Sequence, residues 1–143
     1  MKNLLFLFSI FLLNQACMAQ SLSQHEWKHR VILLFAPSFQ NENLQQQLKI
    51  FQKDEEGLTD RKLIVYQITP DEIKKEGEVL NENSEVKSWF KKFNINKNEF
   101  TFILIGLDGG EKMRNSEVVS IDKLFSKIDR MPMRQSEINR NKN

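Results

Sequence analysis

The chain has 143 residues, of which 40% are hydrophobic and 28% are charged, and its formal net charge is +2. This length suits a single domain, and the composition is that of a globular protein that can bury a core. The net charge is too small to indicate a nucleic-acid partner, and no basic stretch is interleaved with aromatic residues.

The first twenty residues have the pattern of a secretory signal peptide. Lys2 gives a positive start, an apolar run interrupted only by Ser9 covers residues 4–13, and small residues lead to Ala19. The run is long enough for the hydrophobic part of a signal peptide and too short to span a bilayer. We therefore expect a signal peptide over residues 1–19, and a secreted, periplasmic or cell-envelope location.

Cys17 is the only cysteine of the chain. It is either removed with the signal peptide or acylated as a lipid anchor. The second alternative lacks the usual context, because Asn14 stands where a lipobox has an apolar residue. In both cases the mature domain has no free thiol and no disulfide, although the expected compartment permits disulfides. No transmembrane helix is expected in the mature chain.

Two buried strands are predicted in the first half of the mature chain. Residues 30–36 and 62–68 contain the apolar runs VILLF and LIV, which are typical of strands covered on both faces. Pro37 ends the first strand and Pro70 follows the second. The polar residues 71–82 that come next are expected to form a loop with a helical turn.

A helix is predicted between these two strands, over residues 41–53. Its apolar residues recur at helical spacing and form one stripe: Leu44, Leu48 and Phe51. The acidic residues 54–56 and Gly57 are expected to end this helix.

The second half of the chain is predicted to contain a helix, a hairpin and a final helix. The first helix covers residues 84–93, with Ser84 as its N-cap and an apolar side formed by Val86, Trp89, Phe90 and Phe93. A third apolar strand at 100–106 and a polar edge strand at 111–117 are joined by Asp108-Gly109-Gly110, a hairpin turn signal. Ser120 caps the last helix, Pro132 interrupts it, and a disordered tail is expected over residues 140–143.

The resulting order is β-α-β-α-β-β-α. Helical connections between buried strands imply parallel pairing through right-handed crossovers, and the final hairpin adds an antiparallel edge. We therefore predict an α/β fold of the thioredoxin-like kind, with a mixed central sheet of about four strands flanked by helices, in a single domain over residues 20–139.

Four segments carry a resemblance to a known family. They are WKHRVILLFAP at 27–37, RKLIV at 61–65, IGLDGGEK at 105–112 and IDRMPMRQSE at 128–137. Together they resemble domain of unknown function family 4174, which is similar to thioredoxin-like domains of secreted sushi-repeat-containing and coiled-coil-domain-containing matrix proteins. The resemblance implies a thioredoxin-like fold in a secreted or envelope setting, and it implies no established activity.

The junction between the first strand and the first helix is where thiol oxidoreductases carry their Cys-x-x-Cys motif. Here the four residues are Phe39-Gln40-Asn41-Glu42, without sulfur, and the proline that the resemblance implies before the third strand is absent as well. The helix N-terminus is positive and could still bind an anion. Ser38, Phe39, Gln40 and Asn41 are therefore candidate binding residues, with simple helix capping by Ser38 and Asn41 as the alternative.

His25-Glu26-Trp27-Lys28-His29 fits the zinc-hydrolase motif H-E-x-x-H. On a helix this motif presents two zinc ligands one turn apart. The segment leaves little room for a stable helix before the first strand, and no third histidine exists. We therefore expect no metal at His25, Glu26 and His29.

The segment IDRMPMR is the remaining candidate site. Met131 and Met133 are adaptable contact residues, and Arg130 and Arg134 are either an anion- or partner-binding edge or members of solvated ion pairs with Asp129 and Glu137. Both interpretations remain open from the sequence.

The sequence favours a non-catalytic binding or scaffold module without a cofactor. Its partner is expected to be an envelope or extracellular protein or an anionic ligand. The first alternative is a peroxiredoxin- or thioredoxin-like oxidoreductase by descent, and the second is the zinc hydrolase. No catalytic residue is assigned.

Overall fold

The computed structural model describes residues 22–82 and 84–142. In chain order the elements are the 3-10 helix η2 (Leu22–His25), β1 (Arg30–Phe35), α2 (Glu42–Gln52), α3 (Glu55–Asp60), β2 (Leu63–Ile68), β3 (Glu72–Lys75), β4 (Glu78–Glu82), α4 (Ser84–Lys92), β5 (Thr101–Ile105), β6 (Glu111–Asn115), α5 (Ile121–Asp129) and α6 (Pro132–Asn141). The predicted signal peptide, Cys17 and its lipid-anchor alternative lie outside the described residues.

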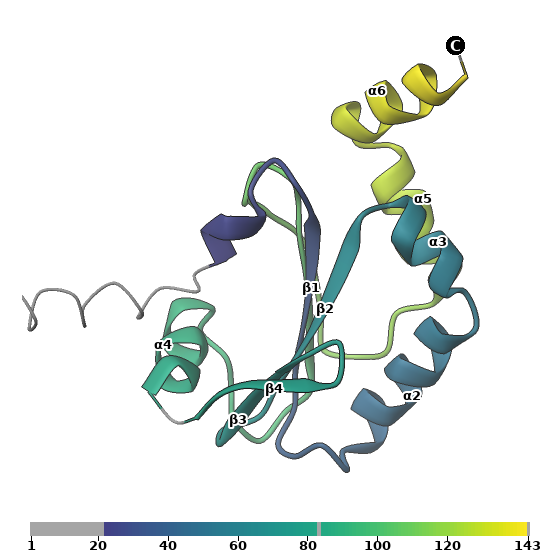
Figure 1. The fold of residues 1–143 in the computed structure, drawn as a ribbon. Coiled ribbons are helices and arrows are strands. Elements are labelled where there is room, and N and C mark those ends of the chain that lie inside the picture. Colours follow the sequence, from purple (N-terminus) through teal and green to yellow (C-terminus); the bar gives the residue numbers. More distant parts are fainter. Residues whose placement is uncertain (1–21, 83, 143) are drawn as a thin grey trace, which may run out of the picture.

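The strands form one mixed sheet of six strands in the order β4-β3-β2-β1-β5-β6. Helix α4 covers one face, while α2, α3 and α5 cover the other, and α6 lies at one end of the sheet (Figure 1). The α/β class and the mixed sheet flanked by helices are confirmed, although the sheet has more strands than the four predicted.

The central strand β1 is buried along its whole length. It pairs in parallel with β2 and antiparallel with β5. Parallel pairing was therefore predicted correctly for β2 and wrongly for β5. Residues 93–100 bring the chain back to the carboxyl end of β1 before β5 begins, so that Thr101 pairs with Phe35 and β5 runs in the opposite direction.

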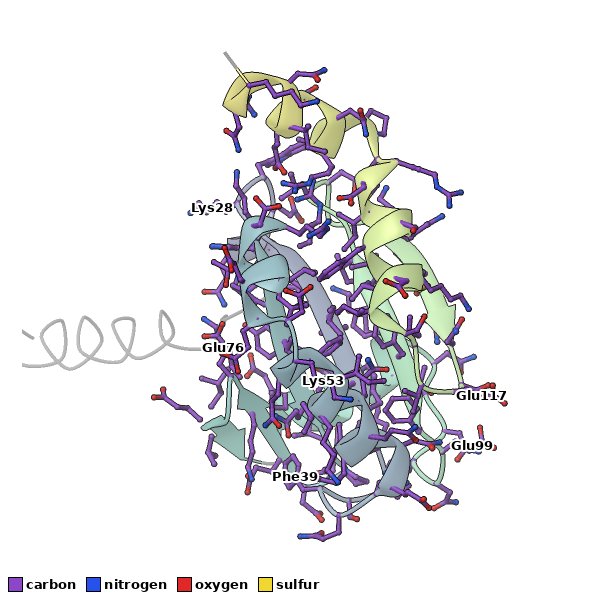
Figure 2. All side chains as sticks on the ribbon, turned by 90° about the vertical axis from the view of Figure 1, so that its right-hand side faces the viewer. Lys28, Phe39, Lys53, Glu76, Glu99 and Glu117 are labelled. Atoms are coloured by element: carbon purple, nitrogen blue, oxygen red, sulfur yellow. The ribbon has the colours of Figure 1, made fainter. Side chains whose placement is uncertain are left out.

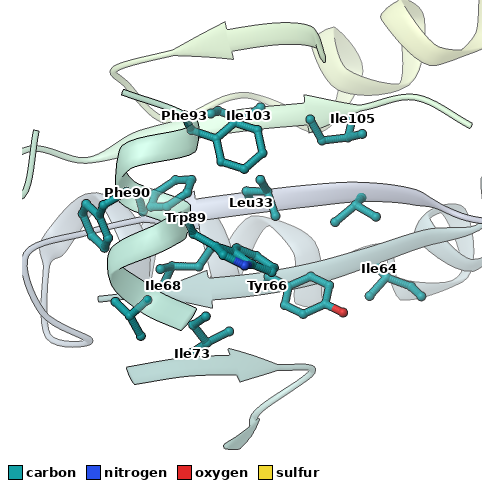
Figure 3. Close-up of a cluster of buried hydrophobic side chains, with 13 residues drawn as sticks. Leu33, Ile64, Tyr66, Ile68, Ile73, Trp89, Phe90, Phe93, Ile103 and Ile105 are labelled. Atoms are coloured by element: carbon teal, nitrogen blue, oxygen red, sulfur yellow. The ribbon is translucent and has the colours of Figure 1, made fainter. Parts of the chain in front are cut away.

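The face under α4 is a dry aromatic core. The predicted apolar side of α4 is buried there (Figure 3). The ring centroids of Phe35 and Phe90 lie 5.2 Å apart in an edge-to-face arrangement. Tyr66 and Trp89 pack 5.4 Å apart in the same cluster. This packing buries Val31, Leu33 and Phe35 of β1, while Ile32 and Leu34 face the opposite side of the sheet.

The opposite face is sealed by α2, α3 and α5. Leu44, Phe51, Leu124 and Ile128 are buried against the sheet. Gln47 is fully buried as well, and its amide oxygen accepts from Val119 N at 2.7 Å while its nitrogen donates to Val119 O at 3.0 Å. Both hydrogen-bonding groups of the buried amide are therefore satisfied.

The first half contains one missed helix and one wrong prediction. Helix α2 ends at Gln52 with Lys53 as its C-cap, just before residues 54–57 as predicted, but Asp54 then caps the unpredicted helix α3 by accepting a 2.9 Å hydrogen bond from Gly57 N. Residues 71–82 form the hairpin β3–β4, not a helical turn. The sequence of this hairpin is polar because it lies at the edge of the sheet, with Ile73 as its one fully buried hydrophobic residue among those described.

The second half follows the prediction more closely. Gly109, at φ 75°, forms the turn of the hairpin β5–β6, and Ser120 Oγ accepts from Lys123 N at 3.3 Å to cap α5. Pro132 is the first residue of α6, where its missing N–H is not needed. Helix α6 continues to Asn141, into the segment expected to be a disordered tail. None of the helices over 22–82 and 84–142 is long and apolar enough to cross a membrane.

Candidate functional site

The junction between β1 and α2 is occupied by capping and packing. Asn41 Oδ1 accepts from Leu44 N at 3.1 Å, and the carbonyl oxygen of Phe39 accepts from the Gln45 amide at 2.6 Å. Lys74 Nζ lies 3.8 Å from the centre of the Phe39 ring. Ser38 and Gln40 are exposed. Asn41 and the Phe39 carbonyl therefore already have local structural roles at this helix N-terminus, whereas the side chains of Ser38 and Gln40 face the solvent.

The H-E-x-x-H segment does not form one α-helix. His25 ends η2 and His29 follows a turn. His25 is buried and its Nε2 shares a 2.8 Å hydrogen bond with the hydroxyl of Tyr66. Burial lowers the pKa of His25 and raises that of Tyr66. Glu26 lies against the turn at Gly109, where an added Cβ would come within 2.9 Å of Glu26 Oε1.

Over residues 22–82 and 84–142, no group of three or more His, Cys, Asp or Glu side chains is arranged to hold a metal ion. The two histidines and the glutamate of the motif thus serve local packing and hydrogen bonding in this arrangement.

The four segments that carry the family resemblance meet at the other end of β1. Lys28 and Phe39 mark these two opposite ends of the molecule (Figure 2). Around Lys28 the start of β1, the β5–β6 turn and α6 come together, and Trp27 N donates to Leu107 O at 2.7 Å. Residues that are far apart in sequence therefore form one region.

Helix α6 is fastened to this region by a buried ion network. Arg134 Nη1 donates to Asp60 O at 2.9 Å and to Glu137 Oε2 at 3.4 Å, while its Nη2 pairs with the Asp60 carboxylate. Arg61 donates two hydrogen bonds to Asp129, from Nε to Oδ1 at 3.0 Å and from Nη2 to Oδ2 at 2.7 Å. Arg134 and Glu137 are only 4% and 6% exposed, so the ion pair named in one of the two open interpretations exists, but it is buried and not solvated.

Arg30 is the innermost cation of this region, with 1% of its surface exposed. Its Nη1 donates to Arg61 O at 3.0 Å and to Glu137 Oε2 at 3.2 Å. Its Nε and Nη2 are buried and have no hydrogen-bond partner within the described part of the chain. Leaving such donors unpaired is costly for a folded protein, so these two atoms stand out.

The charges of the network act on its carboxyl groups. Burial alone would raise the pKa of Glu137, but the charge and hydrogen bond of Arg30, with Lys62 and Arg134, bring it below its ordinary value. The pKa of Asp129 is likewise raised by burial and lowered more strongly by Arg61 and Arg134. Both carboxylates are therefore ionised at neutral pH and act as fixed counter-ions.

An open cavity of about 480 Å³ adjoins Arg30 between the β5–β6 turn and the junction of α5 with α6. Its other basic lining residues are Lys112, Lys127 and Arg130. Lys112 Nζ is paired with Asp108 at 2.6 Å, whereas Lys127 and Arg130 are exposed. A cavity of this size with a few convergent charged groups is typical of a small-ligand site.

The remaining side chains of the cavity are largely apolar. They are Leu107, Met131, Pro132 and Met133, beside Gly106 and the Asp108 carboxylate that pairs with Lys112. Leu107 is buried, whereas Met133 is 40% exposed. The cavity therefore combines one deeply buried cation, two exposed basic groups, the Asp108–Lys112 ion pair and an apolar wall.

The family model for the domain of unknown function DUF4174 matches residues 21–137. The chain belongs to the DUF4174 family. Among curated protein sequences no match to this chain is found.

Two solved structures are similar to the DUF4174 chain. The reduced 2-Cys peroxiredoxin of Plasmodium vivax has a TM-score of 0.61 and 16% sequence identity, with 80% of this chain and 84% of that chain covered. Thioredoxin peroxidase I of Plasmodium yoelii has a TM-score of 0.60 and 16% identity, with 80% of this chain and 79% of that chain covered. At this identity the likeness shows a thioredoxin-like fold alone.

In the DUF4174 chain, the binding residues that were predicted from the sequence lie in different parts of the structure. Ser38, Phe39, Gln40 and Asn41 lie at the carboxyl end of β1, while Arg130 lines the cavity at the amino end. Arg134 is buried in the ion network and is absent from the cavity lining. The prediction missed Arg30, whose one sequence signal is a charged residue opening an otherwise apolar buried strand.

Proposed function

We propose that this DUF4174 chain is a binding module that performs no thiol chemistry and holds an anionic group in the cavity beside Arg30. The observation that carries this proposal is the buried Arg30 guanidinium, whose Nε and Nη2 have no partner over the described ranges. A cation fixed by Glu137 and Arg61 O cannot move away to find other partners. Its orientation is therefore fixed, which lowers the cost of binding an anion once the side chains packed over these two atoms shift.

The thiol alternative has less support. Peroxidase and disulfide-exchange chemistry needs a reactive thiolate, and residues 18–143 contain no cysteine. The likeness to the two peroxiredoxin-type structures extends to the fold. The zinc-hydrolase alternative is also weak, because His25 is buried against Tyr66.

We further propose that the chain acts outside the cytoplasm. Support comes from the signal-peptide pattern of residues 1–19. In that setting the anionic group belongs to a free ligand or to an envelope or extracellular protein. A lipid anchor at Cys17 remains the alternative to cleavage after Ala19.

The purified chain tests the absence of thiol chemistry directly. We expect it to reduce insulin disulfides and to consume hydrogen peroxide no faster than a buffer blank, with an active thioredoxin and an active peroxiredoxin as positive controls. Turnover above the blank would overturn the proposal.

A further inference from the structure

Two other arginines of this chain show how a guanidinium holds a carboxylate here. Arg61 donates through Nε and Nη2 to the two oxygens of Asp129, and Arg114 does the same to Glu111 at 2.9 and 2.7 Å. This edge presents two parallel N–H groups that match the two oxygens of one carboxylate. In Arg30 the same edge is the one without a partner among the residues described.

We propose that the cavity binds a monocarboxylate with a short apolar chain. Nε and Nη2 of Arg30 each have less than 1 Å² of accessible surface, so the side chains packed over them shift when the ligand enters, and its two oxygens then accept hydrogen bonds from these two atoms. This inference rests on the proposed function and names its ligand class. Arg30 is fixed on its other side, since Nη1 is held by Arg61 O and Glu137. The bound carboxylate takes at Arg30 the place that Asp129 has at Arg61.

The apolar chain of the ligand follows from the cavity wall. Leu107 and Met131 line the cavity with Met133, whose thioether side chain is exposed and adaptable. The volume of about 480 Å³ admits a ligand of several carbon atoms beyond the carboxylate. Lys127 and Arg130, which are exposed, attract the anion and contribute less to holding it.

The same wall argues against a phosphate. Phosphate sites at helix N-termini use backbone N–H groups of the first turn. The first residue of α6 is Pro132, which has no N–H, and it lines the cavity. The buried donors therefore amount to one planar fork, which matches the two oxygens of a carboxylate and leaves further phosphate oxygens without a buried donor.

Isothermal titration of the purified full chain with hexanoate, hexanamide and inorganic phosphate tests this assignment. We expect hexanoate to bind, and hexanamide and phosphate to bind at least tenfold more weakly. Arg30→Lys keeps the charge but loses the fork, so hexanoate affinity should fall at least tenfold. Arg114→Lys is the matched control: Arg114 uses the same edge on Glu111 at an exposed site, and its variant should bind like the unmodified chain.

A second variant covers the case in which Arg30→Lys does not fold. The double change Lys127→Gln and Arg130→Gln alters two exposed residues, and it should weaken hexanoate binding a few-fold without changing the preference over hexanamide. Equal binding of hexanoate and hexanamide, or no binding of hexanoate to the folded chain, would overturn the carboxylate site.

The outcomes also separate this inference from the proposed function. Phosphate binding that is lost in Arg30→Lys would contradict the carboxylate class and keep an anion-binding module. Failure of both anions to bind would remove the anion site itself. Insulin or peroxide turnover, in contrast, would contradict the non-catalytic function whichever anion binds.

Discussion

The two ends of β1 differ in what their polar groups do. At the carboxyl end, Asn41 caps α2 by accepting from Leu44 N, and the Phe39 carbonyl accepts from the Gln45 amide, so these polar groups serve the fold itself. At the amino end, Arg30 is buried by long-range contacts that satisfy only one of its three nitrogens. A helix N-terminus is thus a weaker indication of a site than a buried cation with unpaired donors.

The largest expected effect of a single change is at the amino end. Glu137→Ala removes the carboxylate shared by Arg30, Arg134 and the half-exposed Lys62, which leaves the two buried arginines with fewer counter-ions. Breaking a buried ion pair from one side typically costs about 3–5 kcal/mol. We therefore expect the free energy of unfolding in urea to fall by about 3 kcal/mol.

Glu117→Ala is the matched control for this change. Glu117 is exposed and no ion pair involving it occurs in the described ranges, so its loss should change stability by less than about 0.5 kcal/mol. Equal urea midpoints for the two variants would show that the ion network contributes nothing to the fold.

The same network makes stability depend on pH. The pKa values of Glu137 and Asp129 lie below their ordinary values of 4.5 and 3.8 in the folded chain, so the unfolded chain binds protons first as the pH falls. The contribution of these two carboxylates to the free energy of unfolding is therefore greatest above about pH 4.5, and it decreases as the pH falls below that value. The lowered pKa of His25 likewise makes stability decrease as the pH falls, but this effect begins at higher pH, below about 6.5.

Urea unfolding of Glu137→Gln at several pH values separates these contributions. As the pH falls below about 4.5, the free energy of unfolding should decrease less in the variant than in the unmodified chain, because one titrating carboxyl is gone. Above that value the stabilities of the two proteins should change with pH in parallel. An identical decrease in both proteins would contradict the assignment to Glu137.

A smaller effect is expected at the carboxyl end. Asn41→Ala removes the cap of α2 and should lower the free energy of unfolding by about 1 kcal/mol, without changing hexanoate affinity. Ser38→Ala should be nearly neutral, because Ser38 is exposed. Urea unfolding and titration of both variants check this. Loss of hexanoate binding in Asn41→Ala would place the ligand at the carboxyl end of β1 and would contradict a site beside Arg30.

The sequence predicted those features that depend on neighbouring residues. The apolar strand β1, the buried stripe of α4 and the caps at Asn41 and Ser120 follow from local patterns, and the structure contains all of them. The hairpin β3–β4 was missed because its edge position leaves it polar, so that it lacks the alternation of a half-buried strand.

The candidate site could be predicted only in part, because it is made by long-range contacts. Arg130 was recognised as a candidate binding residue, but Arg30 and Glu137 are 107 residues apart in sequence. No local pattern reports that α6 folds back onto the start of β1. The position of a charged residue at the head of a buried apolar strand was the available signal.

One spectrum compares both ends of β1 most directly. In a ¹⁵N-labelled chain, the Nε–H signal of Arg30, assigned by its loss in Arg30→Lys, reports the amino end, and the backbone amides of residues 42–44 report the first turn of α2. On addition of hexanoate we expect the Arg30 signal and the Leu107 amide to shift while the α2 amides stay in place. Shifts confined to the α2 amides, with an unchanged Arg30 signal, would contradict the account.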